Sequence, residues 1–136
     1  MINSQDIFTI SSQKQFEKIA LKVFRYQHEN NKCYREFCDF LNTDVQRVKS
    51  IEKIPFLPIQ FFKSRDVIST TEAIQETFTS SGTTGMITSK HLVTDVSLYE
   101  QSYRLAFSEF YGNIEDYVVL ALLPSYLERK GSSLIY

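Results

Sequence analysis

A run of hydroxyl side chains and glycines lies just past the middle of the chain and reads Thr79-Ser80-Ser81-Gly82-Thr83-Thr84-Gly85. Five of its seven residues carry a hydroxyl group, and hydroxyl and exposed backbone N–H groups together donate many hydrogen bonds to an anion. The two glycines let the backbone turn and approach a ligand closely. Residues 73–78 before the run have a strand-like pattern. The run therefore predicts a phosphate-binding loop beside a strand, to which Lys90 adds a positive charge.

Composition alone leaves another interpretation of this loop open, because a Ser/Thr/Gly run is more often a solvated connection than a ligand site. Two well-known phosphate motifs are excluded by spacing. A Walker A loop starting at Gly82 requires glycine at position 87, where Ile87 stands, and one starting at Gly85 requires glycine at position 90, where Lys90 stands. The dinucleotide pattern G-x-G-x-x-G is absent as well.

The residues after the loop alternate between strand and helix patterns. Residues 90–94 are predicted as a second strand, and Asp95 is placed to cap a helix. Gly112 stands where that helix would end. Residues 117–123 form a continuous apolar run that predicts a strand buried on both faces. This order of elements indicates an α/β arrangement. The predicted helix has one face made of Tyr99, Tyr103, Ala106 and Phe110.

The first half of the chain has helical periodicity. Ser12 and Gln15 match a capping box, which predicts a helix beginning near Gln13. A second, shorter helix follows the polar residues 28–32. Its predicted inner face consists of Tyr34, Phe37, Cys38 and Leu41.

A proline-containing segment separates the two halves. Thr43 and Gln46 form a second capping-box pattern just before it. Pro55 and Pro58 disfavour a helix through residues 54–58, although Pro58 can itself open a short helix through Phe62. We therefore expect a helical N-terminal region at residues 1–53 and the start of an α/β domain at residues 54–136.

Whole-chain properties exclude several classes of protein. The 136 residues are 43% hydrophobic and carry a net charge of −1, which gives no electrostatic footprint for nucleic acid or for an anionic membrane. No apolar run spans a bilayer and the N-terminus has no signal-peptide pattern, so we expect a cytoplasmic protein. Cys33 and Cys38 are too few for a disulfide scaffold or a zinc site. Cys38 is predicted to be in the core and Cys33 exposed.

The loop resembles the phosphate-binding signature of the adenylate-forming superfamily, which includes acyl-CoA synthetases and phenylacetate-CoA ligases. The doubled serine and the following Thr88-Ser89-Lys90-His91 are most similar to the acyl-protein synthetase branch. Two flanking segments resemble the same branch, in the same order. They are Ile54-Pro55-Phe56-Leu57-Pro58-Ile59 with Phe61-Phe62-Lys63, and Leu123-Pro124-Ser125-Tyr126-Leu127-Glu128-Arg129 with Gly131-Ser132-Ser133.

The resemblance implies a mechanism and a set of residues. A carboxylic acid, in this branch a fatty acid, reacts with ATP and Mg²⁺ to give an acyl-adenylate, and the acyl group then passes to a protein thiol or to coenzyme A. Tyr126 falls near the family's acyl pocket. The resemblance implies that the residues that bind the ATP phosphates are Ser80, Ser81, Gly82, Thr83, Thr84, Gly85 and Lys90.

The chain also departs from the family pattern. Thr88-Ser89-Lys90 replaces the common Pro-Lys-Gly after the loop, which leaves the role of Lys90 open. The family's adenine, ribose and magnesium motifs, its catalytic lysine and its acyl-accepting cysteine come later than residue 136. No catalytic residue and no protein ligand for a metal is therefore assigned.

We expect the chain to be the N-terminal part of an acyl-activating ligase, with uncovered aromatic faces through which it self-associates. Two other interpretations remain at this point. One is a non-catalytic binding or interaction module derived from this fold, and the other is a phosphate-binding module of unrelated origin.

Overall fold

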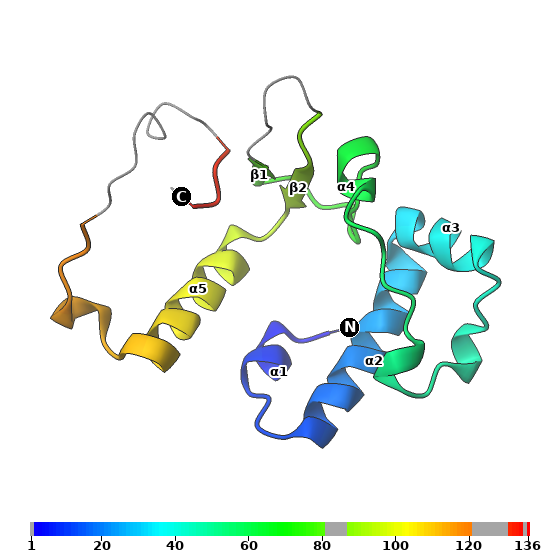
Figure 1. Cartoon of the computed structure of the whole chain (residues 1–136), viewed down its shortest axis with the longest axis horizontal. Helices are drawn as coiled ribbons and strands as arrows, with labels where there is room; N and C mark the ends of the chain where they lie inside the picture. The colour runs from blue at the N-terminus through cyan, green and yellow to red at the C-terminus, as the bar shows by residue number, and fades with distance from the viewer. Residues whose placement is uncertain (1, 81–86, 121–130, 135) are drawn as a thin grey trace. The chain divides into compact units, whose positions relative to one another are not determined.

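The computed structural model describes residues 2–80, 87–120, 131–134 and 136 (Figure 1). They form two compact units, Met1–Glu72 and Ala73–Tyr136, which we call the helical unit and the hairpin unit. The sequence prediction placed the joint at residue 54. In the structure residues 54–72 group with the helical unit, because Ile54 and Leu57 pack against its core.

The helical unit contains short and long helices joined by tight connections. Their bounds are α1 Ser4–Phe8, α2 Gln13–Asn30, α3 Lys32–Phe40, the 3₁₀ turns η1 Val45–Arg47 and η2 Ile51–Lys53, and α4 Phe61–Ser64. The predicted start of α2 is confirmed, since the Ser12 hydroxyl accepts a hydrogen bond from the Gln15 N–H at 3.3 Å. The return bond of the capping box is shifted by one residue, because the Gln15 carboxamide oxygen accepts from the Ser11 N–H.

Asn31 is the joint between α2 and α3. Its backbone N–H donates to the Gln27 carbonyl at the end of α2, while its side-chain oxygen accepts from the Tyr34 N–H at the start of α3. One residue thus caps two helices. It is 2% exposed, so the turn between the helices is fixed by buried hydrogen bonds.

The core of the helical unit lies between α2, α3 and the segment that follows α3. Phe24 and Tyr34 meet edge to face at 6.2 Å between ring centroids, and Cys38 and Val48 complete the buried cluster. The predicted face of α3 is therefore confirmed at Tyr34 and Cys38. Such burial is the main source of stability for helices of this length.

Two predicted helix starts in this unit are displaced. The η1 turn is capped by Asp44, whose carboxylate accepts from the Gln46 N–H, and not by Thr43. The helix expected to open at Pro58 begins at Phe61 instead. The Pro58 carbonyl accepts the Phe61 N–H, so the proline stands in a turn that precedes α4.

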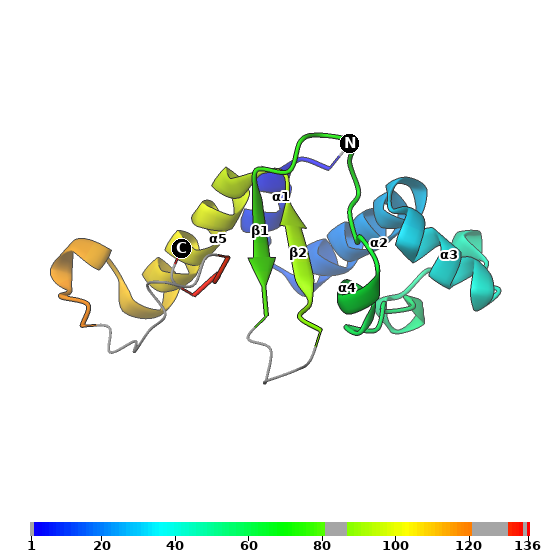
Figure 2. The same cartoon turned by 90° about the horizontal axis from the view of Figure 1, so that it is seen from above.

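The hairpin unit is built on two antiparallel strands, β1 Glu76–Thr79 and β2 Lys90–Val93 (Figure 2). Their register runs from the pair Glu76–Val93 to the pair Thr79–Lys90. Helix α5, Val96–Tyr111, and the 3₁₀ turn η3, Ile114–Asp116, follow. Both strands and the helix were predicted in type and order.

Both ends of α5 are as the sequence predicts. The Asp95 carboxylate accepts from the Leu98 N–H at 3.3 Å. Gly112 follows the helix with a φ of +84°, a backbone conformation that side chains other than glycine rarely adopt.

The strand predicted at 117–123 is wrong over its described part. Residues 117–120 are irregular, and Val118, Val119 and Leu120 are 87%, 70% and 91% exposed. A strand buried on both faces needs neighbouring strands and covering helices, and the only sheet among the described residues is the β1–β2 pair. The described parts of the chain are thus rich in helix with a small sheet, which is consistent with an α/β class.

Candidate functional site

The β1–β2 hairpin closes the base of the hydroxyl-rich loop. Thr79 and Lys90 are the last paired residues of the two strands. Beyond them the Ser80 N–H donates to the Ser89 carbonyl at 3.1 Å, and the Ser89 N–H donates to the Ser80 hydroxyl at 3.0 Å. These two bonds extend the ladder by one step and hold the two ends of the loop together.

Of the residues predicted to bind phosphate or to line the acyl pocket, the structure describes two. Ser80 and Lys90 lie at the base of the loop and are both exposed. The Ser80 hydroxyl accepts the hydrogen bond from the Ser89 N–H, which places this side chain at the closed end of the loop. Outside the described residues lie Ser81, Gly82, Thr83, Thr84, Gly85 and Tyr126.

The other edge of β1 is met by the segment around Gly131. The Thr79 N–H donates to the Gly131 carbonyl at 2.8 Å. Gly131 has a φ of +80°, and a Cβ there would lie 3.0 Å from the Thr77 carbonyl oxygen. Glycine is therefore required for this contact. Thr79 of the hydroxyl-rich run and Gly131, which stand in two of the segments that carry the family resemblance, are thus joined by a backbone hydrogen bond.

A cluster of aromatic side chains packs against Phe78 of β1. Phe78, which is 6% exposed, packs against Tyr99 of α5 at 4.9 Å and against Tyr136 at 5.6 Å between ring centroids. The Tyr99 hydroxyl donates to the Ser133 carbonyl at 2.6 Å. Tyr99 of the predicted face is therefore a packing residue, whereas Phe110 of the same face is 80% exposed.

Neither cysteine has the surroundings of a reactive thiol. Cys38 is fully buried and Cys33 is 7% exposed, so the prediction that Cys33 is exposed is wrong. It fails because Cys33 lies in the first turn of α3, at the buried joint with α2. Burial raises the pKa of both thiols above the usual value, although Arg65 partly opposes this at Cys33. A thiolate nucleophile is disfavoured at both positions.

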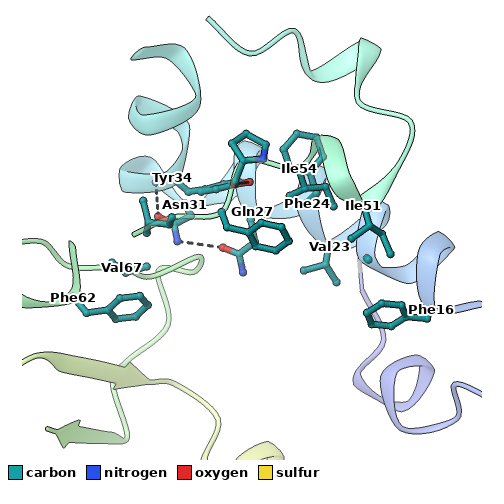
Figure 3. A pocket seen from close by; sticks show the side chains of 14 residues that line it. Phe16, Val23, Phe24, Gln27, Asn31, Tyr34, Ile51, Ile54, Phe62 and Val67 are labelled. Atoms are coloured by element: carbon teal, nitrogen blue, oxygen red, sulfur yellow. Dashed lines mark hydrogen bonds between the residues drawn. The ribbon is translucent and has the colours of Figure 1, made fainter. Parts of the chain in front are cut away.

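The helical unit also contains a pocket that is not predicted from the sequence (Figure 3). It has a volume of about 450 Å³. The polar residues Gln27, Asn31 and Tyr34 lie among its mainly apolar walls. Its walls come from α2, α3, the η2 turn, the proline-containing segment, α4 and Val67. The sequence signals are the polar interruption at residues 28–32 and the apolar residues around Pro55, which the sequence pattern also predicts as the joint between the two regions.

Within the described residues, no group of three or more His, Cys, Asp or Glu side chains could hold a metal ion. None of the helices described is long and apolar enough to cross a membrane.

Comparison with known proteins identifies the family. The family model described as "Acyl-protein synthetase, LuxE" matches residues 1–111. The chain therefore belongs to the acyl-protein synthetase (LuxE) family, and the resemblance seen in the sequence is confirmed.

Two relatives are long-chain-fatty-acid–luciferin-component ligases. The chain is 31% identical over 81 residues to the one from Vibrio harveyi, covering 58% of this chain and 21% of that protein. It is 32% identical over 71 residues to the one from Photorhabdus luminescens, covering 52% of this chain and 60% of that protein. The chain thus spans about a fifth and three fifths of these relatives. No solved structure matched it.

Proposed function

We propose that this chain supplies the phosphate-binding part of an ATP-dependent ligase that activates a fatty or other carboxylic acid as its acyl-adenylate. The supporting observation is the closed base of the hydroxyl-rich loop, with Ser80 and Lys90 at its two ends, in a member of the acyl-protein synthetase family.

The donor groups of the described residues suit a polyphosphate. The Lys90 ammonium supplies a positive charge at the end of β2, and Ser80 contributes a hydroxyl group at the other end of the loop. With Ser81, Gly82, Thr83, Thr84 and Gly85 between them, the loop would hold the β- and γ-phosphates of ATP. The two strands hold Ser80 and Lys90, the residues at the two ends of the loop, close to each other.

The reaction that this arrangement serves has two steps. A carboxylate oxygen of the acid attacks the α-phosphorus of ATP, the bond to the β-phosphate oxygen breaks, and pyrophosphate leaves. A thiol sulfur of a protein or of coenzyme A then attacks the acyl carbon, AMP leaves, and the thiol proton passes to solvent or a base. The loop stabilises the negative charge that develops on pyrophosphate in the first step. Tyr126 is proposed to lie near the acyl group.

Magnesium, when bound with ATP, neutralises phosphate charge. We propose that the magnesium ion is bound as its complex with the nucleotide. The buried thiols of Cys33 and Cys38 are not proposed as acyl acceptors.

The test uses acid-dependent exchange of pyrophosphate into ATP by the polypeptide of the complete reading frame. Lys90→Gln should weaken ATP binding roughly tenfold, as for the loss of one charge-assisted hydrogen bond. Lys63→Gln, at an exposed lysine of the helical unit, is the matched control and should change nothing. Absence of exchange with every fatty and aryl acid tried would refute the activity.

A further inference from the structure

The pocket of the helical unit has a polar wall whose hydrogen bonds have a fixed direction. The Tyr34 N–H donates to the Asn31 side-chain oxygen at 3.1 Å, so the Asn31 amide nitrogen must face Gln27. That nitrogen donates to the Gln27 carboxamide oxygen at 3.2 Å. The same oxygen accepts from the Ser69 hydroxyl at 2.6 Å. The orientation of the Gln27 amide group is thus determined by the backbone of α3.

This chain of bonds leaves one donor group unused. The Gln27 amide nitrogen carries two N–H groups and has no hydrogen-bond partner among the described residues. Figure 3 shows it on the pocket side of Gln27, turned away from Asn31. The Tyr34 hydroxyl, by contrast, is already used, because it donates to the Pro55 carbonyl at 2.6 Å.

The rest of the pocket is apolar and uncharged. None of the described residues that line it has a carboxyl group or a basic side chain, and apart from Gln27, Asn31 and Tyr34 the walls are aliphatic and aromatic. Phe16 and Phe56, at its rim, are 47% and 72% exposed, so the pocket is open to solvent. A volume of about 450 Å³ is within the range of small-molecule sites.

We infer that this pocket binds a neutral molecule with an apolar chain and one carbonyl oxygen, such as an acyl ester, with the carbonyl accepting a hydrogen bond from Gln27. An ionised carboxylate is disfavoured, because no cation lines the pocket and desolvating an unpaired charge is costly. The site lies wholly within the helical unit and goes beyond the activity proposed for the loop.

The experiment titrates the 136-residue chain with methyl octanoate and, separately, with octanoate at pH 8, where the free acid is ionised. Binding is followed by the ¹H–¹⁵N signals of the Gln27 side chain and by calorimetry. We expect the ester to bind at least about fivefold more tightly than the acid and to shift the Gln27 amide signals. Equal or tighter binding of octanoate, or no binding of the ester, would overturn the proposal.

Two variants with matched controls test the hydrogen bond from Gln27 to the ester carbonyl and the space in the pocket for the apolar chain. Gln27→Glu keeps the oxygen that faces Asn31 and removes the donor, so ester affinity should fall about fivefold. Gln46→Glu, at an exposed glutamine of η1, should leave it unchanged. Ala20→Leu places three extra carbon atoms in the pocket and should abolish binding, whereas Ala106→Leu on the exposed face of α5 should not.

Two further outcomes are decisive. The folding of Ala20→Leu is first checked from its native helical signals. If this variant then binds the ester as tightly as the unmodified chain, the ester does not bind in the pocket. This result holds even if the Gln27 variant fails to fold. If the Gln27 side-chain amide becomes protected from solvent as the protein concentration rises, with no ester present, a second copy of the chain occupies the pocket. This result would overturn the proposal. Neither result depends on the ATP loop, so this inference and the proposed activity can fail separately.

Discussion

The helical unit and the hairpin unit differ in how much of their apolar surface is buried. The helical unit has a buried cluster of Phe24, Tyr34, Cys38 and Val48. In the described part of the hairpin unit, Phe78 is the only buried hydrophobic residue. Burial of apolar surface is the dominant source of stability, so the helical unit should be the more stable of the two. The exposed rings of Phe110 and Tyr111 belong to the aromatic surface through which self-association is predicted.

The difference also separates two kinds of site. The apolar pocket is framed by the well-packed helices, whereas the hydroxyl-rich loop is held by two four-residue strands and a few backbone bonds. Ligand-binding loops are commonly found in regions of low local stability.

The largest expected effect is at the core of the helical unit. Phe24→Ala removes the ring that packs edge to face on Tyr34 and should lower the free energy of unfolding of this unit by about 3–5 kcal/mol. Phe40→Ala, at a ring that is 83% exposed, is the control and should cost less than about 0.5 kcal/mol. Urea unfolding followed by circular dichroism measures both, and equal costs would contradict the assigned core.

A smaller and more local effect is expected in the hairpin unit. Phe78→Ala removes the ring that packs on Tyr99 and Tyr136 and should destabilise this unit by about 3 kcal/mol, at the lower end of the range for a buried ring. Amide hydrogen exchange should accelerate in β1, β2 and α5 and stay unchanged in α2 and α3. Phe110→Ala is the control. Faster exchange throughout the chain would show that the units do not unfold separately.

The cysteines provide a test without mutation. Because Cys38 and Cys33 are buried and burial raises the pKa of both thiols, both should react with a disulfide reagent at least about tenfold more slowly than in urea-unfolded chain. Rapid labelling of Cys33 in the folded protein would place it at the surface and contradict the packed α2–α3 joint.

The smallest effect is at the start of α5. The Ser97 hydroxyl donates to the Asp95 carboxylate at 2.6 Å and is the main cause of its lowered pKa. Asp95→Ala should destabilise the helix by about 1 kcal/mol, while Asp66→Ala, at an exposed aspartate of the helical unit, should have no effect.

The pH dependence of this contribution has a defined sign. Since the pKa of Asp95 is lower in the folded than in the unfolded chain, its contribution is fully present above the ordinary aspartate value near pH 4 and is lost as the pH falls through the lower, folded value. Asp95→Asn should remove this acid dependence while keeping an acceptor for the cap. An unchanged acid transition in that variant would contradict the assignment.

Local features were predictable from the sequence and non-local ones were not. The caps at Ser12, Asp95 and Gly112 depend on residues within one turn of the helix end, so short patterns identify them. The strand predicted at residues 117–123 failed over 117–120 because burial depends on neighbours that the pattern does not contain. Cys33 was misplaced for the same reason, since its burial comes from the packing of α2 and α3.

The candidate site shows the same division. The base of the loop at Ser80 and Lys90 follows from two strand patterns on either side of a hydroxyl-rich run. The polar residues 28–32 and the apolar residues around Pro55 do not by themselves indicate a pocket, because the pocket forms only after α2, α3 and the segment around Pro55 pack together. The family resemblance pointed to the loop and contained no information on this pocket.

The most direct test of the account is a titration of the isotope-labelled chain with ATP and Mg²⁺, followed by the backbone ¹H–¹⁵N signals of both units. We predict saturable shifts at Ser80, Ser89 and Lys90, with the signals of α2 and α3 unchanged, and a weaker response in Lys90→Gln. No saturable shift at the base of the loop, or shifts confined to the helical unit, would contradict the proposal that this chain holds the phosphates of ATP.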